Sequence, residues 1–285
     1  MTLDLAGSAV VATTTGIVFL DRFTGLTKFV LDPSDGNMTY TAVLPGPSDR
    51  MYVEGAAGGT AYVGAINLAT DQFVWEHPIT SAGVPSGGIA TDFQDNVYVA
   101  ANQLTAFSGA SGLKLWAAKS PLPSGSFGST PVIGHGGVVY ATSLSTATAK
   151  PTENLAAFST SGGTMLWSKS TTWGGIGPPV LGWQGQIYWQ IANFVGSPAN
   201  PLPLNYYGLN TCAVLANGDL ISVGDTSGPY FERVPTIQCT DPDQTTVRWT
   251  QIFSNADGPD AFAVAVGHDG SIYYGAEGGL YQLKP

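Results

Sequence analysis

Residues 88–119 read GIATDFQDNVYVAANQLTAFSGASGLKLWAAK, and this stretch decides how the rest of the chain is interpreted. It contains four short apolar segments that are separated by tight turns rich in Gly, Ser, Asp and Asn. The last segment, LKLWA, alternates apolar and polar residues with the period of two that a half-buried strand shows. The stretch therefore predicts one antiparallel sheet of four strands, which is the blade of a β-propeller.

The second of these segments recurs along the chain as a Gly or Asp followed by an apolar pair. The instances follow one another at intervals that average about 40–45 residues, the period of a propeller blade. They are centred on Val10, Tyr52, Tyr98, Tyr140, Tyr188, Ile221 and Tyr273. We therefore predict an all-β, seven-bladed β-propeller of four-stranded antiparallel blades, in a single domain over 1–285. The predicted repeats span roughly 1–35, 36–80, 81–120, 121–170, 171–207, 208–254 and 255–285.

An aromatic residue recurs on the predicted fourth strand, shortly after a tight turn. Such a turn needs one residue at positive φ, which Gly adopts freely and Asp tolerates. A large ring at this fixed place can cover the gap to the neighbouring blade. The turn residues are Gly25, Asp71, Gly112 and Gly163, and the aromatic residues are Phe29, Trp75, Trp116, Trp167 and, after a longer turn, Trp249.

Two repeats depart from this pattern. In the fifth, Gly196 and three prolines follow closely on one another, and proline cannot donate a hydrogen bond within a central strand. We therefore expect an irregular fifth blade. The seventh repeat stops at LYQLKP after its third strand, while TLDLA already supplies the first strand of the first blade. We expect a last blade that has three strands, is completed by another chain, or is cut short by the end of the sequence.

Composition limits the classes of partner. Charged residues make up 11% of the chain, against about 25% in an average soluble domain, which suits an extracellular, cell-surface or virion protein. The net charge of −10, with only ten Lys and Arg in all, argues against nucleic acid. No apolar stretch approaches the roughly 20 residues of a membrane span, so we expect no membrane insertion. The start, MTLDLAGSAVVATT, lacks the basic region of a signal peptide.

Three of the hairpins, TGLTKF, SGLKLW and GGTMLW, resemble the repeat of pyrroloquinoline-quinone-like β-propellers. The resemblance extends over most of the chain and is clearest in the first four repeats. The family includes quinoprotein alcohol dehydrogenases, cell-envelope scaffold lipoproteins and binding propellers. The dehydrogenases carry an adjacent cysteine pair and a calcium-bound cofactor with a catalytic Asp, whereas Cys212 and Cys239 here are 27 residues apart. The resemblance thus favours the scaffold branch, without pyrroloquinoline quinone or another cofactor. The two cysteines can form one disulfide or remain two buried thiols.

The turns that join first and second strands form one group of candidate binding residues. They would ring a central channel, and a ring with two imidazoles and aromatic side chains could hold a ligand. The competing interpretation is that these residues only pack on the next blade, and no nucleophile motif or zinc spacing accompanies them. The candidates are His135, Trp183 and His268, together with Pro47, Phe93 and Ala216.

The longer loops on the opposite face form a second group. In the fifth repeat, Trp173, Tyr206 and Tyr207 could stack against a sugar or a proline-rich peptide, although some aromatic residues nearby must fill the core. Carboxylates in these loops could coordinate calcium, or could serve turn chemistry alone. The loops span 32–40, 76–88, 120–130, 171–177, 193–207 and 253–260, and the carboxylates are Asp32, Asp35, Asp257 and Asp260, with Glu76 as a further member.

These observations favour a non-enzymatic interaction or structural propeller that assembles with protein partners or with copies of itself. Carbohydrate binding through the aromatic loops is the first alternative. A quinone-dependent or carbohydrate-active enzyme is the second, because two carboxylates at catalytic spacing cannot be placed from sequence.

Overall fold

The computed structural model of this chain contains β-strands and turns, and no helix occurs among the residues it describes. The all-β prediction is confirmed for this part of the chain. No described helix is long and apolar enough to cross a membrane. The described residues are 2–3, 8–21, 23–32, 37–47, 49–79, 88–145, 152–171, 177–182, 185–189, 192–194, 202–203, 211–227, 233–242, 246–252, 263–266, 270–276 and 279–283.

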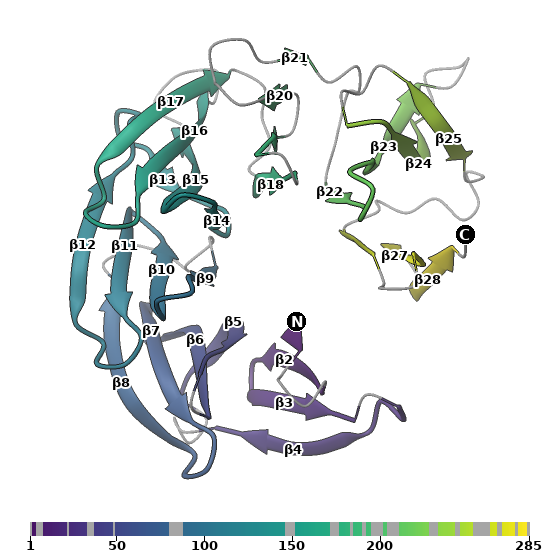
Figure 1. The fold of residues 1–285 in the computed structure, drawn as a ribbon. Coiled ribbons are helices and arrows are strands. Elements are labelled where there is room, and N and C mark those ends of the chain that lie inside the picture. Colours follow the sequence, from purple (N-terminus) through teal and green to yellow (C-terminus); the bar gives the residue numbers. More distant parts are fainter. Residues whose placement is uncertain are drawn as a thin grey trace. The chain divides into compact units, whose positions relative to one another are not determined.

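Two compact units make up the chain, Met1–Pro178 and Pro179–Pro285. The first unit contains four antiparallel sheets that follow one another in chain order, coloured purple to teal in Figure 1. The first sheet consists of β1 (Thr2–Leu3), β2 (Ala9–Thr13), β3 (Gly16–Leu20) and β4 (Thr27–Leu31); the second of β5 (Thr39–Pro45), β6 (Arg50–Ala57), β7 (Thr60–Asn67) and β8 (Gln72–Ile79); the third of β9 (Ile89–Thr91), β10 (Asn96–Ala100), β11 (Gln103–Ser108) and β12 (Lys114–Lys119).

The fourth sheet has five strands, so the prediction of four strands in every blade is wrong here. Its strands are β13 (Ser126–Phe127), β14 (Val132–Gly134), β15 (Val138–Ser145), β16 (Thr152–Ser159) and β17 (Met165–Thr171). Both β13 and β14 pair with β15, so one edge strand is interrupted. Pro131, which lacks an N–H, lies in the interruption.

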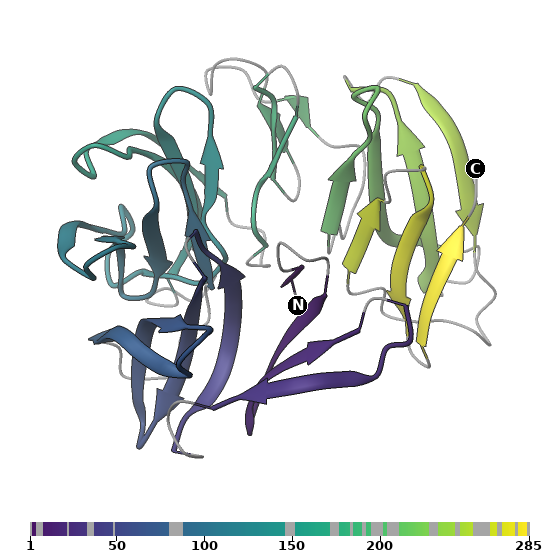
Figure 2. The same ribbon diagram turned by 60° about the horizontal axis from the view of Figure 1, so that its bottom comes forward.

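The second unit contains three further sheets, shown in green to yellow in Figure 2. They consist of β18 (Val180–Leu181), β19 (Ile187–Trp189), β20 (Ala192–Phe194) and β21 (Leu202–Pro203); β22 (Thr211–Val214), β23 (Leu220–Ser227), β24 (Arg233–Thr240) and β25 (Val247–Ile252); and β26 (Ala263–Val266), β27 (Ile272–Ala276) and β28 (Gly279–Leu283). The β18–β21 sheet has strands of only two or three residues, as its prolines predict, and Pro203 lies on its edge strand. The β26–β28 sheet has three strands among the described residues.

The predicted aromatic position has the same geometry in five sheets. Its residue is paired with the third strand immediately before a β-bulge, which leaves one residue of the fourth strand unpaired. Three of the partners are alanines, which leave room for a large ring on that face. The pairs are Phe19–Phe29, Ala65–Trp75, Ala106–Trp116, Ala157–Trp167 and Cys239–Trp249.

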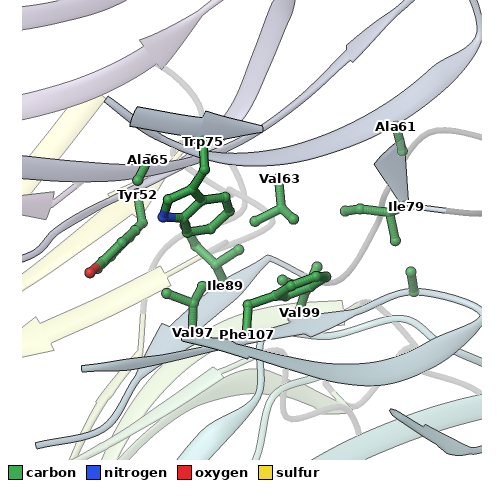
Figure 3. Packing of buried hydrophobic residues seen from close by; sticks show 11 residues of the cluster. Tyr52, Ala61, Val63, Ala65, Trp75, Ile79, Ile89, Val97, Val99 and Phe107 are labelled. Atoms are coloured by element: carbon green, nitrogen blue, oxygen red, sulfur yellow. The ribbon is translucent and has the colours of Figure 1, made fainter. Parts of the chain in front are cut away.

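Trp75 covers the gap between the second and third sheets, as predicted. Its Nε1 donates a hydrogen bond of 2.8 Å to the carbonyl oxygen of Gly109 in the β11–β12 turn. In the same turn Gly112 has a φ of 70°, and a Cβ there would lie 2.6 Å from Cγ of Trp75. Figure 3 shows Trp75 and Phe107 approaching the shared core from opposite sheets. Gly112 is therefore required both by the turn and by the ring.

Trp116 repeats this contact one sheet further along. Its Nε1 donates a hydrogen bond of 2.7 Å to the carbonyl oxygen of Thr160, and a Cβ on Gly163 would lie 2.5 Å from its ring. The φ of Gly163 is 66°, and Asp71 takes φ of 50° at the corresponding place in the second sheet, as the turn requires. The tryptophan of one sheet thus packs on the turn of the next.

Positive charge is concentrated on the fourth strands. An edge strand exposes unpaired backbone groups, and lysine on such an edge prevents pairing with another chain. Five of the ten Lys and Arg of the chain lie on fourth strands: Lys28, Lys114, Lys119, Lys169 and Arg248. The few cations are therefore placed where they protect the sheets from edge-to-edge aggregation.

The tight fit of Gly112 can be measured against a matched glycine. Gly25 has nearly the same φ, 68°, but a Cβ there would meet nothing within 4 Å. Both Gly→Ala changes carry the cost of a non-glycine residue in the left-handed region, about 1–2 kcal/mol. We expect Gly112→Ala to lower the free energy of unfolding by at least about 1 kcal/mol more than Gly25→Ala, because only Gly112→Ala displaces a buried ring. Urea unfolding followed by circular dichroism measures both, and equal losses would contradict the ring contact.

Candidate functional site

The turns between first and second strands carry exposed side chains. Phe93 is fully exposed, and Pro47, His135 and Ala216 are exposed on their own turns. The interpretation that these residues pack on the next blade is therefore wrong for Phe93, and the ligand-binding role of all four stays a prediction. Trp183 and His268 lie outside the described residues.

The aromatic loop residues Trp173, Tyr206 and Tyr207 lie outside the described residues, so carbohydrate binding through them stays a prediction. The neighbouring aromatic residues Tyr188 and Trp189 are buried on β19. The hydroxyl of Tyr188 donates a hydrogen bond of 2.9 Å to the carbonyl oxygen of Pro242. These two rings therefore fill the core, as expected for some of the aromatic residues in this repeat.

Of the four aspartates considered for calcium, only Asp32 is described. It follows β4 and accepts a long hydrogen bond, 3.5 Å, from the hydroxyl of Tyr40. The other three, Asp35, Asp257 and Asp260, lie outside the described residues. No group of three His, Cys, Asp or Glu suited to a metal ion occurs in the part of the chain that the structure describes. The start of the loop predicted over 76–88 is wrong, because β8 continues to Ile79 and Glu76 pairs with Gly64, and residues 80–87 lie outside the described residues.

Both cysteines are free thiols, which settles the disulfide question for this structure. Cys212 lies on β22, while Cys239 is buried opposite Trp249 on β24. Burial raises the pKa of Cys212 to about 12 and that of Cys239 to about 11, the latter with a smaller contribution from Asp219. Both groups are therefore protonated near neutral pH, which removes them as nucleophiles.

Thiol chemistry tests this assignment. Because the thiolate is the reactive form, we expect neither cysteine to react appreciably with a disulfide reagent in the native protein near neutral pH. Both should react at once in concentrated guanidinium chloride. Colorimetric titration of the two states measures this, and a rapidly reacting thiol in the native state would disprove the raised pKa of that residue.

A polar cluster connects the second and third sheets. Asp95, in the β9–β10 turn with φ of 65°, accepts hydrogen bonds from Tyr52 and from Arg50, the latter at 3.1 Å. Arg50 also donates to the carbonyl oxygen of Gly109 at 3.2 Å. Burial, then the hydrogen bond to Asp95, raises the pKa of Tyr52. The cluster holds the start of β6 against the β9–β10 and β11–β12 turns. The sequence signal for it is a charged residue shortly before a strand tyrosine, as Arg50 stands before Tyr52 and Asp95 before Tyr98.

Glu54 is a buried carboxylic acid that sequence inspection did not identify. It lies on β6 with 1% of its surface exposed, accepts a hydrogen bond from the backbone N–H of Gly88, and leaves its Oε1 without a partner among the described residues. Burial raises the pKa of Glu54 to about 7. Its carboxyl group therefore titrates near neutral pH.

Glu54 makes stability depend on pH. Because its folded-state pKa exceeds its ordinary value of 4.5, the folded protein binds the extra proton. This contribution is fully present below pH 4.5 and is lost as pH rises through 7. We expect the free energy of unfolding to fall by up to about 3 kcal/mol over that interval, relative to Glu54→Gln. Urea unfolding at several pH values measures the difference, and parallel curves for the two proteins would rule it out.

A groove lies in the second unit between β25 and the β26–β28 sheet. It encloses about 440 Å³ and is lined by Leu215, Trp249, Thr250, Gln251, Ile272 and Leu283. Trp249 has 37% of its surface exposed, whereas Trp75 at the corresponding position has 8%. The exposures differ because the β11–β12 hairpin of the next sheet covers Trp75, whereas the β26–β28 sheet has no fourth strand, and so no such hairpin, among the described residues. No strand pairs with the outer edge of β28 among the described residues.

Comparison with known proteins supports the fold. Residues 59–186 match the family model described as outer membrane protein assembly factor BamB, which confirms the resemblance to pyrroloquinoline-quinone-like repeat propellers over this segment. No curated protein matches the chain.

Solved structures give the same fold over nearly the whole chain. BamB from Moraxella catarrhalis matches with a TM-score of 0.67 and 14% identity, over 98% of this chain and 82% of that one. The computationally designed protein Ika8 matches with a TM-score of 0.71 and 12% identity, over 98% and 80%. At such identities the likeness shows the all-β propeller fold, which natural and designed proteins share, and no more.

Proposed function

We propose that this chain, a propeller with pyrroloquinoline-quinone-like repeats, is a protein-interaction scaffold that holds an extended segment of a partner protein against β28. The observation that carries the proposal is the groove beside Trp249, where a large ring and a strand edge are exposed together. We take the seven sheets among the described residues as seven blades. The low charge content, 11%, supports a location outside the cytoplasm as part of the same proposal.

The edge of β28 supplies affinity without regard to sequence. A strand that lies at the edge of a sheet offers N–H and C=O groups to an added strand, which is a common mode of peptide recognition. Gln282 on β28 directs its side chain to the hydroxyl of Tyr273, at 3.1 Å, so this side chain is held within its own sheet. The backbone edge of β28 is the part that a partner strand would engage.

The groove supplies selectivity. Leu215, Ile272 and Leu283 provide an apolar surface beside the ring of Trp249, while Thr250 and Gln251 add polar groups. Fully burying one large apolar side chain is worth about 1.5–3 kcal/mol. The bound segment therefore carries a large apolar residue and, next to Trp249, a glycine turn of the kind that covers Trp75 and Trp116. The name of the matched family, an assembly factor, is consistent with such a role.

The chain itself provides a probe for this site. Residues 159–171, STSGGTMLWSKST, form the turn and fourth strand that cover Trp116. We expect a fluorescently labelled peptide of this sequence to bind the protein saturably, and Trp249→Ala to weaken binding at least about tenfold, or 1.4 kcal/mol. Val247→Ala is the matched control, since Val247 is exposed on the same strand but does not line the groove.

Fluorescence anisotropy measures the three affinities. Equal binding by wild-type protein and Trp249→Ala, or no binding at all, would overturn the groove as the docking site. Size-exclusion chromatography with light scattering identifies the case in which a second copy of the chain is the partner.

A further inference from the structure

The boundaries between sheets in the first unit can be compared position by position. The shared β-bulge makes the third and fourth strands of successive sheets equivalent, residue by residue. Five positions face each boundary. They are Leu31, Tyr62, Gly64, Ile66 and Phe73 between the first and second sheets; His77, Gln103, Thr105, Phe107 and Lys114 between the second and third; and Ala118, Asn154, Ala156, Phe158 and Met165 between the third and fourth.

The middle boundary differs from its neighbours in chemistry and in packing. At the first boundary Leu31 and Ile66 are buried in one apolar cluster, with Tyr62 and Phe73 packed against it. At the third boundary Ala156 and Phe158 are buried, with Ala118 packed against them. At the middle boundary four of the five positions carry polar groups, and a cavity of about 300 Å³ lies among them. Packing between sheets, which is served by apolar residues at the other two boundaries, therefore does not explain the four polar residues at the middle one.

One wall of the cavity is aromatic. The rings of His77 and Phe107 lie 5.5 Å apart and within 10° of parallel. Trp75 adds a third ring, 5.7 Å from His77 and 6.2 Å from Phe107, tilted by less than 30° to each. Figure 3 shows Trp75 pointing from its own strand toward the sheet that carries Phe107. His77 and Phe107 line the cavity and give it an apolar aromatic wall against which a planar group can pack, while Trp75 supports this pair from outside the cavity.

The other groups at the cavity are hydrogen-bonding and cationic. Gln103 and Thr105 on β11 supply an amide and a hydroxyl, and Lys114 on β12 supplies an ammonium group. Lys119 is paired with Gln103 across β11 and β12, so its side chain lies on the same face of the sheet. Glu76 is next to His77 on β8, but strand alternation directs it to the opposite face. Two lysines thus flank this groove in a protein of net charge −10.

We propose that the groove between β8 and β11 binds a small planar anion, of the class of aromatic carboxylates. The flat body packs on His77 and Phe107, and the carboxylate pairs with Lys114. Gln103 and Thr105 bind polar substituents on the ring. The volume lies at the small end of ligand sites, which suits a molecule with one ring. This site is in the first unit and is independent of the proposed groove beside Trp249.

4-Hydroxybenzoate is a suitable probe, and 4-hydroxybenzyl alcohol is its neutral counterpart. We expect saturable binding of 4-hydroxybenzoate by isothermal titration calorimetry, with the alcohol at least about tenfold weaker because a charge-assisted hydrogen bond is lost. Lys114→Met, which installs the residue found at this position in the fourth sheet, should weaken 4-hydroxybenzoate at least about tenfold. His77→Leu, which installs the residue of the first sheet, should do the same by filling the cavity.

Lys169→Met is the matched control, since it removes the same charge from another fourth strand and should change the affinity less than about twofold. Circular dichroism and thermal unfolding establish that all three variants fold. The proposal is overturned if wild-type protein does not bind 4-hydroxybenzoate, if the alcohol binds equally well, or if Lys114→Met and His77→Leu bind like the control.

Discussion

The contact between a tryptophan on one sheet and a glycine turn on the next is the constraint on which the described fold depends. Trp75 and Trp116 each bury a ring against a turn that only glycine can form at that distance, and each indole N–H donates to a carbonyl of the same turn. A single four-stranded sheet cannot bury its hydrophobic faces alone and buries them by packing against the neighbouring sheets. Coupling between neighbours therefore carries the stability, as in other repeat proteins.

The sequence predicted the parts of the fold that repeat. The positive φ at Asp71 and Gly163 follows from turn chemistry, and the aromatic position follows from its fixed distance to that turn. The short strands around Pro203 follow from the missing N–H of proline. The split first strand of the fourth sheet was not predicted, because β13 and β14 are too short to show an alternation of apolar and polar residues. Both are defined only by their pairing with β15.

The candidate sites were harder to predict, because each depends on residues from two sheets. The exposure of Phe93 and His135 cannot be read from a turn sequence. Glu54 lies in the apolar segment MYVEGAA, and only its contact with Gly88 of the next sheet shows that the carboxyl group is buried. The groove between β8 and β11 is formed by residues of two sheets, and the register set by the β-bulge determines which of their side chains face each other.

The β-bulge also divides each hairpin between two neighbours. In the third sheet, the residues before the bulge, Ala106 and Trp116, face the fourth sheet, while Phe107 and Lys114 after it face the second. One hairpin thus carries the matching surface for both of its neighbours. A duplicated or deleted repeat keeps these surfaces in order, so the number of repeats can change during evolution without loss of fit. A single-residue insertion at the bulge would instead exchange the two faces, and selection should act more strongly on the length of this hairpin than on its composition.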